Sequence, residues 1–456
     1  MFVFIVAIVI MVVMISRFKI HPFVSILLVS LVLGIVGGIP IVDTTAADGT
    51  VTKGIVNIIT AGFSASFASI GLVIIFGGMI GTFLEATGAT LRLADDTVRL
   101  VGQKRPALAI EIMGWIVSIP VFCDSAFVIL NPVRKALVKK TGTSSVAMPM
   151  CLSAGLFASH VLIPPTPGPI AAANALDVGD NWLLVIACGA LVSIPALAGA
   201  YGYARYISKK VKDSDEMTAD ETIQSYEALI ASYGKLPGTM ASLAPIAVPI
   251  ILITISNLAT TLGITGPLAN ALSFLGSPVI ALAIGALLAV CLLVKSKRQE
   301  SIYDLSNDTL KVIGPILFVT AAGAALGKVI ASTSLVDFIT SNANVFQTVG
   351  IFFPFLLAAI LKTAQGSSTV AITTTAGIIA PLMAALGLDS QAMSVLSVMA
   401  IGAGAMVASH ANDSYFWVVT NFGGLDVQKG YKTQTMVTLV EGVCAMIAVF
   451  IISLFV

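Results

Sequence analysis

One short stretch of the chain, ASHANDSYFW (408–417), places several polar side chains next to one another. His410 and Asp413 can both exchange a proton, since histidine titrates near neutral pH and a buried carboxyl group favours its neutral form. Asn412 and Ser414 can donate and accept hydrogen bonds, as recognition of hydroxyl groups requires. The stretch therefore combines groups that bind a small hydroxylated molecule with groups that hold a proton beside it.

The sequence around this stretch is apolar. Of the 456 residues, 57% are hydrophobic and 10% are charged, and apolar runs long enough to cross a bilayer recur along the chain. The composition predicts an all-α polytopic membrane protein, with about ten spanning helices. The net charge is only +1, and the sequence has no run of basic residues with aromatic residues between them. Nucleic-acid binding is therefore excluded. A charged residue inside such a protein costs about 2.5–3.5 kcal/mol and so indicates function.

Basic residues predict the orientation, because Lys and Arg are concentrated in cytoplasmic loops. Connectors that carry almost no basic charge are predicted outside, as are both termini. These connectors are 41–54, 177–181, the 260s and 270s, and 332–348. The clusters predicted inside are Arg17/Lys19, Arg92 to Arg105, Arg134 to Lys140, Arg205 to Lys212, Lys295 to Lys311 and Lys429/Lys432.

The apolar segment 106–140 lies between two inner clusters, so it must leave and return on the same face. This arrangement predicts a re-entrant hairpin. Its arms, about 106–119 and 126–138, would each cover roughly 20 Å of a core roughly 30 Å thick, so that the tip stops inside the membrane. The tip reads PVFCDSAF, with Pro120 breaking the helix and Asp124 and Ser125 at the turn.

A mirror hairpin is predicted over 350–384, between two outer connectors. The sequence AQGSST (364–369) interrupts its helix, because Gly366 permits a tight turn and the hydroxyl residues that follow can cap a new helix. The capping residues are Ser367, Ser368 and Thr369.

An internal duplication relates the two halves. The tripeptide ASH occurs at 158–160 and at 408–410, and LDV follows at 176–178 and at 425–427. Upstream, Gly77 and Gly81 match Gly323 and Gly327 at a single offset, and both pairs are interpreted as sites of close helix packing. Five crossings between equivalent points would invert the second copy, and inverted repeats with discontinuous helices are typical of secondary transporters.

The expected organisation follows from this duplication. An extra helix over 1–20 precedes a first repeat over 21–205, with its hairpin at 106–140 and a helix over 146–176 that the prolines of PPTPGP break. A cytoplasmic linker and a connecting helix occupy 206–260. The second repeat spans 261–456, with its hairpin at 350–384 and a broken helix at 392–424. The two tips and the two breaks are expected to meet at one polar cavity.

Four motifs, SHANDSYFWVV, QGSSTVAITTTAG, PVFCDSAFVILNP and PPTPGPIAAA, together resemble the gluconate permease (gluconate:proton symporter) family of the ion transporter superfamily, over nearly the whole chain. The resemblance implies an elevator-type transporter, commonly dimeric, that takes up gluconate or related hydroxy acids, or D-serine in one branch. The family commonly has two Phe before the hairpin Asp and a His between the prolines. This chain has Phe122-Cys123 and Thr166 there, which keeps a smaller acid such as glycerate or a four-carbon sugar acid open.

The expected site has two parts. Helix starts beyond each tip offer unpaired N–H groups to a carboxylate. The expected substrate-binding residues are Ser125, Thr166, Gly366, Ser367, Ser368, Thr369, Asn412 and Ser414, and the expected proton-coupling residues are Asp124, Asp413, His160 and His410. Lys328 and Glu85 are interpreted as snorkelling from helix ends, and a pair between Lys362 and Glu111 is one interpretation; the role of Glu441 is left open.

The sequence thus predicts a proton-coupled symporter of a small hydroxy or sugar-acid monocarboxylate in the bacterial cytoplasmic membrane, functioning as a homodimer among lipids. Sodium coupling and a D-serine-type substrate are the alternatives that the same fold allows. No metal-ligand spacing or cofactor motif is found. A serine hydrolase is disfavoured, because no nucleophile-elbow pattern places a serine beside a histidine, and a passive channel would be excluded by accumulation against a gradient.

Overall fold

The computed structural model describes residues 2–45, 49–93, 96, 105–211, 234–261, 264–296, 301–334, 341 and 350–456. These residues are mostly helical, as the composition predicts. One short antiparallel hairpin pairs β1 (Thr44–Thr45) with β2 (Val51–Thr52), with Thr44 opposite Thr52. The described residues leave out much of the linker predicted within 206–260, most of the connector 332–348 and part of the basic cluster from Arg92 to Arg105.

The first half of the chain contains these helices: α1 (Phe2–Ser16), α2 (Pro22–Val36), α3 (Ile55–Ala86), α5 (Pro106–Val117), α6 (Cys123–Thr141), α7 (Ala147–Leu162), α8 (Pro167–Ala175) and α9 (Trp182–Ile207). The second half contains α11 (Thr239–Thr261), α12 (Pro267–Leu275), α13 (Pro278–Lys295), α14 (Ile302–Ala331), α17 (Phe352–Gln365), α18 (Ser368–Ile379), η1 (Ala380–Leu382), α19 (Gln391–Met406), α20 (Ser414–Gly423), α21 (Val427–Gly430), η2 (Tyr431–Thr435) and α22 (Met436–Ser453).

Helix length and hydropathy are those of a multi-pass membrane protein. Among the described residues, six helical stretches are long and apolar enough to cross a bilayer. A seventh, α3, passes the same test but is bent by 45° between Ser69 and Gly71. The arms of the predicted hairpins include shorter apolar helices, at Pro106–Val117, Phe352–Gln365 and Ser368–Leu382. The total of about ten spans remains a prediction.

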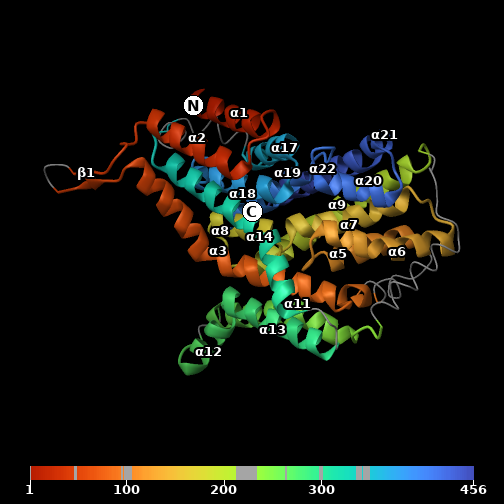
Figure 1. Cartoon of the computed structure of the whole chain (residues 1–456). Helices are drawn as coiled ribbons and strands as arrows, with labels where there is room; N and C mark the ends of the chain where they lie inside the picture. The colour runs from red at the N-terminus through yellow and green to blue at the C-terminus, as the bar shows by residue number, and fades with distance from the viewer. Residues whose placement is uncertain are drawn as a thin grey trace.

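Two long helices, α3 and α14, pack against each other through the middle of the molecule (Figure 1). On one side α11 and α13 pack together and α13 contacts α3, while on the other side α8 contacts α3 and α18 contacts α14. The remaining helices build a larger body in which α5 packs on α7, and α17 and α22 pack on α19. The β1–β2 hairpin and α12 project at the left of the view, and α6 and α21 lie at its right.

Glycines let α3 approach both interruptions of the first half. A Cβ atom on Gly81 would lie 2.3 Å from the carbonyl oxygen of Pro120, in the first hairpin tip, and one on Gly77 would lie 2.9 Å from that of Pro165, in the first broken helix. Both distances are shorter than real contacts of a Cβ atom, so only glycine fits without a shift. The interpretation of these glycines as packing positions is confirmed, and α3 thereby holds the tip beside the break.

The connector between α2 and α3 is closed by Asp43. Its Oδ1 accepts hydrogen bonds from the Gly54 N–H at 2.6 Å and from the Asn57 amide at 2.8 Å. The Gly54 bond is the larger cause, and the Asn57 bond the second, of a pKa for Asp43 below its ordinary value, because both bonds favour the ionised carboxylate.

The first hairpin differs from its predicted boundaries at the tip. Helix α5 ends at Val117, and α6 begins at Cys123, so Asp124 and Ser125 lie in the first turn of a helix rather than in the turn between the arms. A carboxylate in a first turn interacts favourably with the positive end of the helix dipole, which explains why the helix starts ahead of Asp124. The prediction that these two residues form the turn is wrong by a few positions.

Candidate functional site

The second hairpin breaks where the sequence predicts. Helix α17 ends at Gln365, and Gly366 adopts a left-handed conformation with φ of +88°. Ser367 then caps α18, accepting a hydrogen bond from the Val370 N–H at 3.3 Å. The predicted capping role of Ser367 is confirmed, while the next two residues, Ser368 and Thr369, lie inside α18 and are buried.

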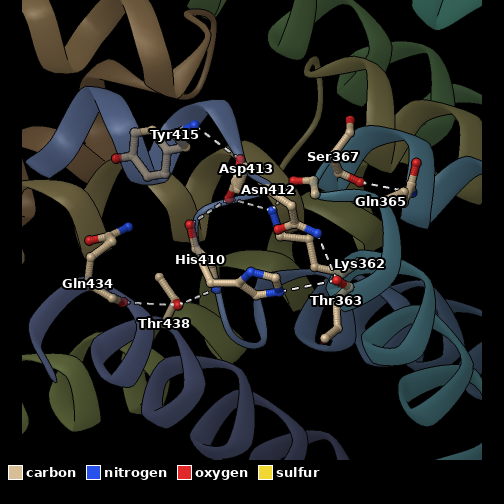
Figure 2. A network of polar contacts seen from close by, with 12 residues as sticks. Lys362, Thr363, Gln365, Ser367, His410, Asn412, Asp413, Tyr415, Gln434 and Thr438 are labelled. Carbon is tan, nitrogen blue, oxygen red and sulfur yellow. Dashed lines mark hydrogen bonds and ion pairs between the residues drawn. The ribbon is translucent and has the colours of Figure 1, made fainter. Parts of the chain in front are cut away.

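The second broken helix opens between α19 and α20, over 407–413. Asp413 caps α20, and its Oδ1 accepts a hydrogen bond from the Tyr415 N–H at 3.0 Å. The two breaks touch, because a Cβ atom on Gly366 would lie 2.1 Å from the Asn412 carbonyl oxygen. Hairpin tip and broken helix therefore form one junction in the second half (Figure 2).

A buried ion pair holds this junction together. Lys362 Nζ, on α17, lies 2.6 Å from Asp413 Oδ2, and the two side chains are 1% and 6% exposed. The ammonium group also donates to the Gly366 carbonyl at 2.5 Å and lies 5.6 Å from the centre of the Phe157 ring. Ser409 donates to the same Asp413 Oδ2 at 2.5 Å. Each charge is thus paired and hydrogen-bonded, as a buried ion pair requires.

Two further side chains tie the broken helix to α17. The Asn412 amide donates to the Thr363 carbonyl oxygen at 2.7 Å, and His410 Nε2 lies 3.1 Å from that same oxygen. On the hairpin side, the Gln365 amide donates to the Ser367 carbonyl at 3.2 Å. These bonds fix the side chains that surround the ion pair (Figure 2).

The first half supplies the opposite wall of the site. Ser414 lies within hydrogen-bonding range of the Asp124 carboxyl group, which is also in electrostatic range of Asp413. His160, at the end of α7, stands with its ring 6.0 Å from that of Phe122 in the first tip. The first tip, the second tip and the second break therefore lie close together.

Thr166 behaves differently from the sequence expectation. Its hydroxyl is 3% exposed and donates to the Ile163 carbonyl at 2.8 Å, within its own break. The first break instead approaches α18 through Gly168, where a Cβ atom would lie 2.9 Å from the Ile372 side chain. In this conformation Thr166 stabilises the backbone turn and does not present its donor to the junction.

Several polar atoms around the junction have no hydrogen-bond partner among the described residues although they are buried. A buried polar atom without a partner costs about 1–3 kcal/mol, so a cluster of them in one place indicates a missing ligand or water. The atoms are Asp124 Oδ1, His160 Nδ1, Gln365 Oε1 and Asn412 Oδ1. Asp124 belongs to the first hairpin and Gln365 to the second, while His160 lies near the end of α7, before the first break, and Asn412 lies in the second break. Unpartnered polar atoms from four separate segments thus surround one place, as they do in a binding site.

Sequence reasoning missed the cation of this site. A pair between Lys362 and Glu111 was one interpretation, but Lys362 binds Asp413, and both carboxyl oxygens of Glu111 are without hydrogen-bond partners within the described part of the chain. Ser409 was also missed, although it belongs to the duplicated ASH. An intramembrane lysine close to a predicted break was the available signal.

Glu111 on α5 and Glu441 on α22 are fully buried. All four of their carboxyl oxygens lack hydrogen-bond partners among the residues that the structure describes, and the two groups are in electrostatic range of each other. An uncompensated carboxylate is too costly to bury, so both groups are expected to be neutral. Among the described residues, no hydrogen bond or ion pair joins either group to Lys362 or Asp413.

The sequence of this chain is similar to those of known permeases. A family model described as GntP family permease matches residues 1–455. An uncharacterized permease of Haemophilus influenzae is 34% identical and is aligned over 93% of this chain and 86% of its own length. The inner membrane permease YgbN of Escherichia coli is 31% identical, over 94% and 93%, and a gluconate permease of Zymomonas mobilis is 29% identical, over 97% and 95%.

Two solved structures share the fold. The Alcanivorax borkumensis YdaH transporter aligns over 94% of this chain and 96% of its own, with a TM-score of 0.62 at 16% identity. Neisseria gonorrhoeae MtrF, described as representing a class of antimetabolite efflux pumps, aligns over 96% of both chains, with a TM-score of 0.65 at 14% identity. With the family match over the whole length, the chain belongs to the GntP family of permeases and is a multi-pass membrane transporter.

Proposed function

We propose that this transporter moves a small hydroxy or sugar-acid monocarboxylate into the cell, together with protons, across the bacterial cytoplasmic membrane. The observation that carries the proposal is the buried pair of Lys362 and Asp413, set between two helix breaks and surrounded by unpartnered polar atoms. A gluconate permease among the relatives supports the class of substrate. Gluconate, glycerate and a four-carbon sugar acid all have the required carboxylate and hydroxyl groups.

The substrate carboxylate binds between Lys362 and the start of α18. Ser367 is the N-cap residue of α18, so the first N–H groups of this helix lie at the break. These groups and the positive end of the helix dipole favour a bound anion. Gly366 keeps the backbone free of a Cβ atom beside the ligand. Ser368 and Thr369, in the first turn of α18, complete this part of the site.

Substrate hydroxyl groups are recognised on the other side of the junction. Asn412 has a free amide oxygen that accepts a hydrogen bond, and Gln365 offers a second one. Ser414 is exposed at the start of α20, and Ser125 is partly exposed in the first turn of α6. A site of this composition distinguishes a hydroxy acid from an acid without hydroxyl groups, since each lost partner leaves a buried polar atom unpaired.

Proton coupling follows from the same ion pair. An incoming carboxylate competes with Asp413 for Lys362, and Asp413 then becomes neutral by taking up a proton. Asp124, within electrostatic range of Asp413 and with one unpartnered oxygen, is the second carboxyl group of the proton-coupling set. His160 and His410 adjoin the pair and complete the proton-coupling set.

The transport cycle uses two inverted repeats in an elevator movement, with the hairpins carried past the α3–α14 pair, in a homodimer. The connector with the β1–β2 hairpin has a single basic residue, whereas α6 and α21 together contain several. These two regions lie at opposite ends of the view in Figure 1, which supports the predicted orientation with both termini outside.

Uptake by purified protein in liposomes tests this function. With an imposed pH gradient (acid outside) in sodium-free buffer, gluconate or glycerate should accumulate, and collapse of the gradient should stop accumulation. Asp413→Asn should abolish accumulation while counterflow exchange of substrate persists at a reduced rate. Accumulation that requires sodium, or that is restricted to D-serine, would replace this proposal by its alternatives. Uptake with unchanged pH dependence in Asp413→Asn would reject the role of Asp413.

A further inference from the structure

A cavity with a mostly apolar lining and a few polar groups lies away from the ion pair, between α3 and α14 on one side and α8 and α18 on the other. Its volume is about 440 Å³, within the range of small-molecule sites. Small residues form much of its lining, among them Gly62 on α3, Gly327 on α14 and Gly377 on α18, which also let these helices pack closely. None of the residues expected to bind substrate lies in its lining.

Lys328 gives this cavity a positive charge. It lies in the last turn of α14, lines the cavity and is exposed. A Cβ atom on Gly62 would lie 3.0 Å from the Lys328 Cβ, so this glycine leaves room for the lysine to lie against α3. No carboxylate among the described residues forms an ion pair with Lys328. An unpaired cation in a cavity attracts an anion, more strongly than the same charge on an open surface.

Several other polar groups of the cavity offer acceptor atoms. Ser69, Thr320 and Thr373 line it, and each donates its hydroxyl hydrogen to a carbonyl oxygen of its own helix, at 3.1, 2.8 and 3.2 Å respectively. Asn174 also lines it and donates one of its two amide hydrogens to the Ile170 carbonyl oxygen at 3.1 Å. Their oxygen atoms remain available to accept. One cation and several acceptors match a molecule that has one carboxylate and several hydroxyl donors.

The cavity adjoins the proposed substrate site along shared helices. Thr373 follows Ser368, at the start of α18, by five residues, or about 7.5 Å along the helix. The lining positions lie towards the start of α3 and the ends of α8, α14 and α18, and all of these ends lead to connectors predicted outside. The cavity is therefore on the outer side of the junction.

We propose that this cavity is an entry site for the hydroxy acid, where Lys328 binds the carboxylate and the acceptor oxygens bind the hydroxyl groups before the substrate reaches Lys362. The inference rests on the proposed function and deepens it, because it assigns a first binding step and a specificity for polyhydroxy acids. It also gives Lys328 a role other than that of a side chain snorkelling from a helix end.

The test measures initial uptake of gluconate, glycerate and lactate into liposomes at low ionic strength. Lys328→Gln should raise the KM for gluconate roughly fivefold with a maximal rate within about twofold of wild type, and Lys328→Arg should remain close to wild type. Lys53→Gln removes an exposed charge from a predicted outer connector and is the matched control. Added salt should raise the KM of the wild type and of Lys53→Gln but not that of Lys328→Gln.

A second variant tests the acceptors. Thr373→Val keeps the shape of the side chain but removes an oxygen, so the KM should rise by roughly threefold for gluconate and remain unchanged for lactate. Equal KM values and equal salt dependence in Lys328→Gln and Lys53→Gln would overturn the entry site while leaving the proposed function intact. Failure of the wild type to take up any of these acids would overturn both.

Discussion

The ion pair of Lys362 and Asp413 predicts a large and specific loss of stability when one charge is removed. Both side chains are almost fully buried, and their charged atoms lie 2.6 Å apart. Breaking a buried pair by removal of one partner typically costs 3–5 kcal/mol. For Asp413→Asn we expect about 3 kcal/mol, at the lower end, because the amide oxygen of asparagine and the Gly366 carbonyl still accept from the lysine.

The double variant distinguishes the interaction energy between the two charges from the contribution that each side chain makes with its other neighbours. Lys362→Met alone leaves Asp413 with the Ser409 hydroxyl and the Tyr415 N–H, and should also cost about 3 kcal/mol. Lys362→Met combined with Asp413→Asn removes both charges, so it should be no less stable than either single variant. The coupling energy of the cycle is then about 3 kcal/mol in favour of the pair.

Reversible unfolding in mixed micelles with increasing sodium dodecyl sulfate, followed by far-UV circular dichroism, measures these free energies. Asp308→Asn is the control, because Asp308 pairs with Lys311 on the surface, where the side chains are 63% and 76% exposed, and no change in the free energy of unfolding is expected. The reasoning is refuted if the costs of the two single variants simply add in the double variant.

Three further perturbations test the junction and its surroundings. Gly366→Ala forces a Cβ atom onto a residue at φ of +88° and against a facing carbonyl oxygen, so it should cost at least about 2 kcal/mol in the same unfolding assay, whereas Gly202→Ala, with open space around it, should be neutral. Glu111→Gln and Glu441→Gln should each change the free energy of unfolding by less than about 1 kcal/mol if both carboxyl groups are neutral; a larger loss would show that a charge is needed there. The lowered pKa of Asp43 means that its bonds stabilise the connector above the ordinary aspartate range and are lost as the pH falls through the folded-state pKa. Proteolysis of this connector should therefore accelerate in acid in the wild type, and Asp43→Asn should remove that dependence.

Local chemistry explains what could be predicted from the sequence. The breaks follow from residues that act on their own backbone, such as Pro120 and Gly366, and the cap at Ser367 follows from its position after a glycine. The glycine pairs could be recognised as packing positions because the duplication repeats them. Each of these features is encoded within a few residues of where it acts.

Long-range contacts explain what was missed. Lys362 and Asp413 are separated by 51 positions, and periodicity does not indicate which of several intramembrane charges a lysine will meet. Lys362 and Glu111 both lie on hairpin arms, and only the folded arrangement places the lysine at the second break instead. Thr166 was misjudged for a related reason, since its hydroxyl satisfies a carbonyl group that the break itself exposes.

The balance of charge at the junction leads to a prediction about the driving force. Lys362 and Asp413 sum to zero, and we consider the cycle in which Asp124 keeps the same charge throughout. A bound monocarboxylate then brings one negative charge, and a single proton on Asp413 restores neutrality. Since moving an uncompensated charge through the membrane core is costly, the loaded site should move with one proton for each substrate. Transport would then be electroneutral.

A potassium diffusion potential set with valinomycin, without a pH gradient, should leave the rate of gluconate uptake unchanged, whereas a pH gradient without a potential should drive accumulation. Accumulation driven by the potential alone would mean that more protons enter, and that Asp124 is ionised before the substrate binds.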